Sequence, residues 1–218
     1  MFKAVMLGCG GRARGHAQAY KHVKRGKLAA VCDVNSERLH ALTTEFGIEK
    51  KYTNFEEMLT KEKPDLLHIV TPPSLRYSLM SIAAKHNVPA TIIEKPIAIQ
   101  AEDWRDLVRL SKETKSKFIV NTQLNFHPRN LELKRDVTEG RIGEITFIDA
   151  SARSTVINQG PHVLQLVSSY INNSRPTRVF GNISMGKHIS GNEPAPDHAV
   201  ASVDYENGVR AALTFGTE

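Results

Sequence analysis

The sequence predicts an α/β fold in which a doubly wound parallel sheet is followed by an α+β domain with a mostly antiparallel sheet. Three observations support this prediction. Apolar runs of strand length alternate with helical patterns through about residue 120. The first run ends in a glycine-rich turn, GCGGRARGH, at residues 8–16. After about residue 145, strand patterns follow one another across short turns, which is typical of antiparallel pairing.

The chain length fits one large domain or two small ones, and we place two domains at residues 1–121 and 122–218. Its 218 residues have an apolar content of 40%, ordinary for a globular protein. The formal charge is +6, but lysine and arginine are scattered among aspartate and glutamate. Because no basic run is interleaved with aromatic residues, we predict no nucleic-acid partner.

Cysteine usage and hydropathy indicate the compartment. The two cysteines, Cys9 and Cys32, form neither a CxxC pair nor a disulfide framework. The N-terminal apolar run is too short for a signal peptide, and no apolar stretch approaches a membrane span. We therefore expect a cytoplasmic protein with no membrane partner.

The first strand, turn and helix form a dinucleotide-binding motif of the Rossmann type. Phe2 to Leu7 is the strand. Gly8 permits the tight turn, Gly10 lets the backbone approach a pyrophosphate, and Ala13 lets the helix pack closely on the strand. The phosphates would lie at the helix N-terminus, where N–H groups and the helix dipole favour negative charge. One helical face is expected to hold Ala13, Ala17, Tyr20 and Val23.

An acid follows the second expected strand, Leu28 to Cys32. Asp33 can accept hydrogen bonds from both hydroxyls of an adenosine ribose and would repel a 2′-phosphate. The sequence therefore favours NAD over NADP. Arg38 is close enough in sequence to leave NADP open.

The rest of the first half continues the alternation of strands and helices, with Gly26 breaking the first helical pattern. Further strands are expected at residues 51–53, 66–70, 90–93 and 117–120. Helices are expected at residues 36–46 and 74–86, and two more are expected to begin at residue 54 and at about residue 101. On the last helix we expect Trp104, Leu107 and Val108 to face inward.

The ends of these strands predict a ligand crevice. In a doubly wound sheet the ligand lies beyond the carboxyl ends of the strands. Gly8, Asp33, Thr71 and Lys95 all follow strands there and should face one crevice. A cis peptide bond between Lys95 and Pro96 would aim the lysine inward.

The second half of the sequence predicts a different arrangement of helices and strands. Helices are expected at residues 128–138 and from Gly160-Pro161, the latter with Val163, Leu166, Val167 and Tyr170 on its buried face. Strands are expected at residues 145–154, 178–185, 199–205 and 209–215, with a hairpin turn at 206–208. The segment at 190–198 is rich in helix and strand breakers and is expected to be a loop, which could serve as a lid or a subunit contact or could simply be mobile.

These motifs together resemble the glucose-fructose oxidoreductase, inositol dehydrogenase and rhizopine catabolism (Gfo/Idh/MocA) family. The resemblance rests on GCGGRARGH, Asp33, TPPSLR and EKPIAI, and on NTQLNFHP and EGRIGEI at the entry to the second domain. It covers nearly the whole chain. The cofactor site that it implies contains Gly8, Gly10, Gly11, Arg12, Ala13, Asp33, Arg38, Thr71, Pro72, Glu94, Lys95 and Gln123.

The resemblance also implies catalytic residues. In the family, the lysine of the EKP triplet lies by the nicotinamide and the substrate hydroxyl, and Lys95 matches it. An aspartate and a histidine four residues apart occur in the family's second domain. His162 matches the histidine, while Asn158 stands where the acid is expected. Arg76 occupies the usual histidine position of the TPxxxH pattern.

Hydride transfer from a carbinol carbon to nicotinamide requires the hydroxyl proton to leave as the carbonyl forms. A base must lie within hydrogen-bond reach, and a cation should stabilise the developing alkoxide. His162 suits the first task, because an expected position at a helix N-terminus keeps imidazole neutral near pH 7. Lys95 suits the second. Asn158 can orient a hydroxyl but cannot take a proton.

Each assignment has a structural alternative. His162 could be a helix cap or a core residue, and Lys95 a surface charge. For His127 in the NFHP turn, the structural role is favoured. Gln123 and Asn125 could line the substrate pocket or bind backbone.

The sequence thus predicts an NAD(P)-dependent oxidoreductase acting on a sugar, cyclitol or related polyol, with no metal. The alternatives are redox-assisted elimination or glycoside cleavage with transient oxidation by bound NAD, and a non-catalytic NAD-binding protein with a decayed site. Family members are usually longer, so the second sheet is expected to be incomplete. Its open edge and apolar face predict a homo-oligomer, a dimer or tetramer.

Overall fold

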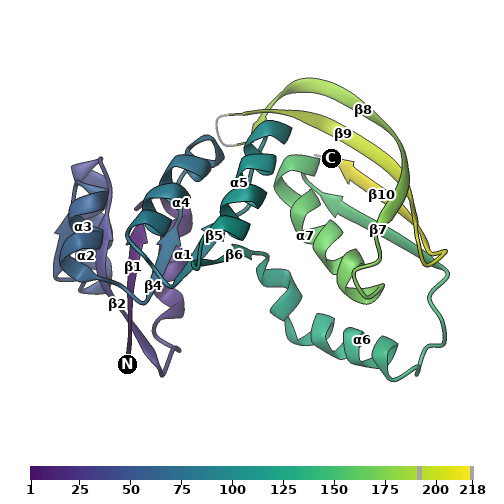
Figure 1. Cartoon of the computed structure of the whole chain (residues 1–218). Coiled ribbons are helices and arrows are strands. Elements are labelled where there is room, and N and C mark those ends of the chain that lie inside the picture. The colour runs from purple at the N-terminus through teal and green to yellow at the C-terminus, as the bar shows by residue number, and fades with distance from the viewer. Residues whose placement is uncertain (191–192, 217–218) are drawn as a thin grey trace. The chain divides into compact units, whose positions relative to one another are not determined.

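The computed structural model describes residues 1–190 and 193–216, with side chains described for 1–184 and 195–216. The chain divides into two compact units, Met1–Asn121 and Thr122–Glu218 (Figure 1). Each has its own sheet and its own apolar core.

A six-stranded parallel sheet forms the first unit, as the sequence predicts. Its strand order is β3-β2-β1-β4-β5-β6. The winding direction reverses between β1 and β4, which is where ligands bind in sheets of this kind. The strands are β1 (Phe2–Leu7), β2 (Gly26–Cys32), β3 (Lys50–Tyr52), β4 (Leu66–Ile69), β5 (Ala90–Glu94) and β6 (Lys117–Asn121).

Helices cover both faces of this sheet. Alternation along β1 sends Val5 and Leu7 into one apolar cluster and Met6 into another. The first cluster includes side chains of α3, α4 and α5, and the second those of α1 and α2. The helices are α1 (Gly11–Ala19), α2 (Ser36–Phe46), α3 (Phe55–Glu62), α4 (Arg76–Lys85) and α5 (Ala101–Glu113), with a 3₁₀ turn at Pro73–Leu75.

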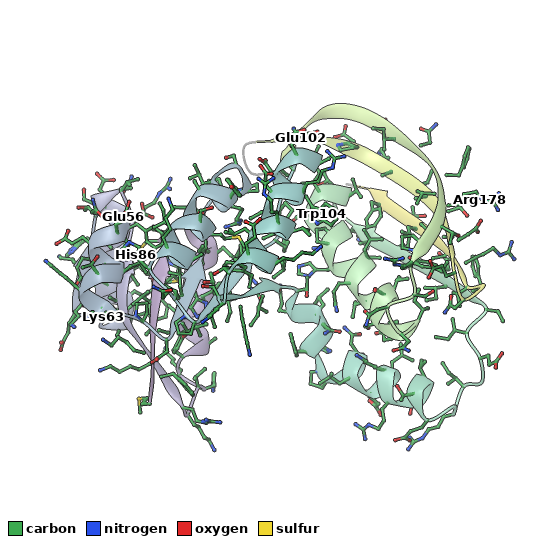
Figure 2. All side chains as sticks on the ribbon, in the orientation of Figure 1. Glu56, Lys63, His86, Glu102, Trp104 and Arg178 are labelled. Atoms are coloured by element: carbon green, nitrogen blue, oxygen red, sulfur yellow. The ribbon has the colours of Figure 1, made fainter. Side chains whose placement is uncertain are left out.

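Three expectations for the first unit are wrong. Helix α1 ends at Ala19, because tight turns follow Tyr20, and Val23 is 45% exposed. Gly26 does not end the first helix, which has already ended at Ala19, but is the first residue of β2. Trp104 projects outward and is 54% exposed (Figure 2), since the inward stripe of α5 runs through Leu107 and Leu110 and leaves Trp104 on its flank.

The second unit is a four-stranded mixed sheet with strand order β7-β10-β9-β8. Both pairings of β9 are antiparallel, whereas β10 pairs with β7 in parallel. Helix α7 packs on one face of this sheet, where Val167 and Ile171 join the apolar core (Figure 1). The elements are a 3₁₀ turn (Gln123–Phe126), α6 (Pro128–Thr138), β7 (Phe147–Arg153), α7 (Val156–Tyr170), β8 (Pro176–Ser190), β9 (Glu193–Tyr205) and β10 (Arg210–Gly216).

The loop expected at residues 190–198 is largely strand. Strand β8 continues to Ser190 and β9 begins at Glu193, while residues 191 and 192 lie outside the described part of the chain. Register shifts around Met185 let the ladder continue opposite Pro194 and Pro196. Prolines are tolerated at such irregularities, so they did not end the strand here.

Helix α7 begins earlier than Gly160-Pro161 predicts. Its first residue is Val156, and the Thr155 hydroxyl caps it by accepting a hydrogen bond from the Asn158 N–H at 3.3 Å. Pro161 therefore lies inside the helix, where it withholds one N–H from the helical ladder. His162 consequently lies in the second turn, and the expected location at the helix N-terminus is wrong.

A polar side chain occupies the middle of the first sheet on the α1 side. His68 of β4 is 6% exposed, and its ring meets those of His16 and Tyr20 edge to face. Its strand neighbours Leu67 and Ile69 point to the opposite apolar cluster. Burial, and secondarily His16, lowers the pKa of His68 from 6.5 to about 3.

The buried imidazole predicts a pH dependence of stability. The unfolded chain binds a proton at His68 near pH 6.5 and the folded chain only near pH 3, so stability is greatest above pH 6.5 and falls as the pH drops toward 3. Between pH 6.5 and 4.5 we expect His68 to account for a loss of about 2 to 3 kcal/mol in the free energy of unfolding. Urea unfolding at both pH values measures it.

The variant His68→Gln keeps a donor and an acceptor at this position and should lose most of that slope. His40→Gln, which changes an exposed histidine of α2, is the matched control and should retain it. Equal slopes in wild type and His68→Gln would contradict the assignment.

Candidate functional site

The glycine turn between β1 and α1 has no room for a side chain at its first position. Gly8 has φ +97°, and a Cβ there would lie 2.4 Å from the Val70 carbonyl oxygen. At Gly10 and Gly11, by contrast, a Cβ would meet nothing within 4 Å. Gly10 is the N-cap of α1, and no described side chain caps that helix, so its first N–H groups remain available to a ligand such as a phosphate. Ala13 is fully buried against the sheet, as expected.

Asp33 ties the end of β2 to this turn. It is 9% exposed, and its carboxylate accepts hydrogen bonds from the backbone N–H of Cys9 at 2.6 Å and of Asn35 at 2.8 Å. A carboxylate has about four acceptor positions, so these bonds leave acceptor capacity for ribose hydroxyls. Arg38, in the first turn of α2, is exposed.

A buried arginine, Arg76, contacts the end of β4. The Arg76 side chain is 2% exposed and donates from Nη1 to the Ile69 carbonyl oxygen at 3.2 Å and to Thr71 Oγ1 at 3.4 Å. Burial lowers the pKa of Arg76 to about 10, with Glu94 opposing the shift, so the guanidinium stays charged at neutral pH. Sequence reasoning noted Arg76 only as a departure from a motif. Pro72 follows Thr71 and starts the 3₁₀ turn as its cap.

The end of β5 carries an ionised carboxylate. Glu94 is 5% exposed, and its Oε1 contacts His16 Nε2 at 2.7 Å and accepts from Asn121 Nδ2 at 2.6 Å and from Arg12 Nε at 3.1 Å. Burial raises the pKa of Glu94, but the hydrogen bonds from His16, Asn121 and Arg12 outweigh it, and the pKa falls to about 2. Glu94 therefore joins α1, β5 and β6 through a negative charge.

Lys95 follows directly and is half-buried. The Lys95–Pro96 peptide bond is cis, as expected. Burial lowers the pKa of Lys95; the charge of Glu94 opposes this shift and that of Arg12 adds to it. A lowered pKa brings an ammonium group closer to the range in which it can exchange a proton.

The remaining predicted residues belong to the second unit. Asn158 and His162 lie one turn apart on one side of α7, and His162 is 3% exposed. The Asn158 amide donates to Ser154 Oγ at 3.1 Å. Gln123 begins the 3₁₀ turn that contacts α7. His162 lies beyond the first turn of α7, so the dipole at the helix N-terminus does not act on its ring.

The structure thus brings the predicted residues into two groups. At the carboxyl end of the parallel sheet lie Gly8, Gly10, Gly11, Arg12, Ala13, Asp33, Thr71, Pro72, Glu94 and Lys95, and on or beside α7 lie Gln123, Asn158 and His162. Sequence reasoning missed His16, Tyr20, His68 and Asn121. One signal was present: His68 interrupts an otherwise apolar strand, LLHI.

Metal-binding clusters and membrane-spanning helices are both absent from the described residues. No group of three or more His, Cys, Asp or Glu side chains there is placed to hold a metal ion. None of the described helices combines the length and the apolar character that a membrane crossing needs.

Comparisons with known proteins agree with this geometry. The model of a family described as "Oxidoreductase family, NAD-binding Rossmann fold" matches residues 2–122. A D-apiose dehydrogenase of Paraburkholderia graminis is 32% identical over 153 residues, which cover 70% of this chain and 40% of that protein. An inositol 2-dehydrogenase of Rhizobium meliloti is 26% identical over 203 residues, covering 91% of this chain and 58% of that protein. The chain spans about half the length of these relatives.

Among solved structures, an oxidoreductase from Agrobacterium radiobacter in complex with NAD+, L-tartaric acid and magnesium superimposes with a TM-score of 0.85. The match covers 99% of this chain and 66% of that one at 23% identity, and at that identity it shows the fold. The family model, in contrast, covers the segment that holds the glycine turn, Asp33 and Glu94-Lys95-Pro96. This chain therefore belongs to the Gfo/Idh/MocA oxidoreductase family, whose first domain is an NAD-binding Rossmann fold.

Proposed function

We propose that this protein is an NAD(P)-dependent oxidoreductase that transfers a hydride between a nicotinamide cofactor and a CH–OH carbon of a sugar, cyclitol or related polyol. The observation that carries the proposal is the end of the parallel sheet, where an open glycine turn, Asp33 and Lys95 follow three of its strands. The relatives named for apiose and inositol support the substrate class.

The first unit fits the cofactor. The open side of Gly10 and Gly11 gives a pyrophosphate access to the backbone, and the spare acceptor capacity of Asp33 suits a ribose diol. A 2′-phosphate would meet the charge of Asp33, so NAD is favoured. The exposed Arg38 is the group that could accommodate NADP. When bound, the nicotinamide ring supplies the hydride acceptor.

The catalytic roles follow from charge and burial. Lys95 stabilises the alkoxide that develops as the hydride leaves, and the neighbouring carboxylate of Glu94 helps keep it charged. His162 accepts the hydroxyl proton, because an imidazole nitrogen can act as a general base. Asn158 orients a substrate hydroxyl, since an amide cannot take the proton.

The proposal includes a homo-oligomer and a cytoplasmic location. Helix α7 covers one face of the second sheet, and Phe147, Phe180 and Val200 on the other face are 54%, 79% and 50% exposed. Exposed apolar side chains on that face support association of copies into a dimer or tetramer. The two free thiols, Cys9 and Cys32, support a reducing compartment.

Cofactor binding is tested first. We expect the wild type to bind NADH more tightly than NADPH in calorimetry, and Asp33→Asn to bind NADH about tenfold or more weakly, because a charged hydrogen bond is lost. Asp149→Asn, on the exposed sheet face of the second unit, is the control and should bind as the wild type. If folded wild-type protein takes up neither coenzyme, the proposed function is wrong.

Turnover is tested with a panel of sugars and cyclitols and NAD, following released NADH. Lys95→Ala should lower kcat by about a hundredfold or more while NADH still binds, because one stabilising cation is lost in the transition state. Lys85→Ala, an exposed lysine of α4, should leave kcat unchanged.

Other outcomes separate the alternatives. Substrate consumption without NADH release, on cofactor that survives purification, would favour transient oxidation. Bound cofactor with no turnover on any substrate would favour a non-catalytic protein. Unchanged kcat in Lys95→Ala would contradict the assigned role.

Self-association is measured by light scattering. The double variant Phe180→Lys, Val200→Lys places two charges on the open sheet face and should give a monomer, because a buried unpaired charge opposes association. The control is Arg178→Lys, which changes an exposed residue of β8, the strand of Phe180, and should leave the association unchanged. A monodisperse monomer in the wild type would exclude the proposed oligomer.

A further inference from the structure

Four side chains form a continuous hydrogen-bonded row between α1 and the parallel sheet. Glu94 Oε1 lies 2.7 Å from His16 Nε2, His16 Nδ1 lies 3.0 Å from His68 Nδ1, and His68 Nε2 lies 2.7 Å from the Tyr20 hydroxyl. Glu94, His16 and His68 are 5%, 8% and 6% exposed. Tyr20 is half-buried and precedes the exposed residues 21–25. The row therefore runs from the end of β5 to a partly exposed tyrosine.

The fold explains why these side chains meet. His16 and Tyr20 are four residues apart and lie on the same side of α1. His68 is paired in register with Met6 of β1 and Ile92 of β5, in the middle of the sheet. Its side chain points to the α1 side, as its contacts with His16 and Tyr20 show.

Hydrogen-bond chemistry gives the row a single direction when each imidazole carries one proton. The ionised Glu94 can only accept, so His16 carries its proton on Nε2. With one proton on each ring, His16 Nδ1 accepts from His68 Nδ1, and His68 Nε2 accepts from the Tyr20 hydroxyl. Every group between Glu94 and the surface then both donates and accepts.

The other groups bonded to Glu94 cannot continue such a chain. Arg12 has no acceptor atom, and Asn121 presents an amide N–H that does not exchange protons in this way. Arg76 and Lys95 act on Glu94 through their charge. Among the three groups hydrogen-bonded to Glu94 Oε1, His16 is the one that can pass a proton both to and from Glu94.

We propose that Tyr20, His68, His16 and Glu94 form a proton path between solvent and the end of β5, beside Lys95. A proton from water binds the Tyr20 oxygen as Tyr20 gives its own to His68 Nε2. His68 passes its Nδ1 proton to His16 Nδ1, and His16 passes its Nε2 proton to Glu94. Each of the first three groups ends with as many protons as it had, and Glu94 gains one. Release follows the same steps in reverse.

Glu94 holds this proton only in transit. Because hydrogen bonds hold the pKa of Glu94 well below its usual range, only a small minority of molecules carries this proton at pH 7. Oxidation of an alcohol releases one proton and reduction consumes one, so a path ending beside Lys95 serves either direction. That use rests on the proposed function, whereas the path itself does not.

The test uses the substrate-free, ¹⁵N-labelled full chain. Long-range ¹H–¹⁵N spectra report which ring nitrogen is protonated, and we expect Nε2 for His16 and Nδ1 for His68. Exchange of these two ring protons with water is then measured. Tyr20→Phe removes the hydroxyl at the outer end and should slow both exchange rates by about tenfold or more.

Tyr52→Phe is the matched control, since Tyr52 also donates its hydroxyl to a carboxylate, that of Glu62, at 2.6 Å. It should leave the exchange unchanged. Unaltered exchange in Tyr20→Phe, or protonation of the opposite ring nitrogens in the wild type, would overturn the path. Should Tyr20→Phe not fold, His68→Gln interrupts the same row, and unchanged exchange at His16 would overturn the path equally. Because no cofactor or substrate is used, this result is independent of the tests of the proposed function.

Discussion

The first unit depends on one buried negative charge. An ionised carboxylate taken out of water is costly unless it is fully hydrogen-bonded. His16 and Arg12 of α1 and Asn121 of β6 supply three such contacts to one oxygen of Glu94, Oε1. These bonds hold the helix that follows the glycine turn against the strand that precedes Lys95. The position of α1, and with it the proposed site for a pyrophosphate, is thus set partly by the end of β5.

Helix α1 shows the consequence for packing. Its inward side consists of Ala13 and Ala17, which allow close approach to the sheet, and of His16 and Tyr20, which are polar. A stripe in which small and polar residues alternate has little amphipathic contrast. The prediction placed Val23 on an apolar face of this helix, but the helix ends before that residue, at Ala19. Tertiary hydrogen bonds, which local periodicity does not record, give the helix its orientation.

Local chemistry made most of the fold predictable. Gly8, Asp33 and Lys95 mark strand ends by residue type and spacing, and the doubly wound sheet places them at one end. The start of α7 was not predictable in this way, because Thr155 supplies a cap that outweighs the usual meaning of proline in Gly160-Pro161. Nor were the lengths of β8 and β9, where cross-strand pairing continues past prolines. In both cases an interaction overrides the preference of single residues.

The row from Tyr20 to Glu94 was beyond sequence reasoning for a different reason. His16 and His68 are 52 positions apart and meet only because β4 pairs with β1, a long-range feature of the strand order. Replacing buried polar groups with well-packed apolar ones is often neutral or stabilising. A leucine at position 68 would suit the apolar strand around it, and the imidazole there instead lowers stability in acid. Packing alone does not require a polar row that lowers stability in acid. Proton transfer does require such a row, and this one ends beside a half-buried lysine.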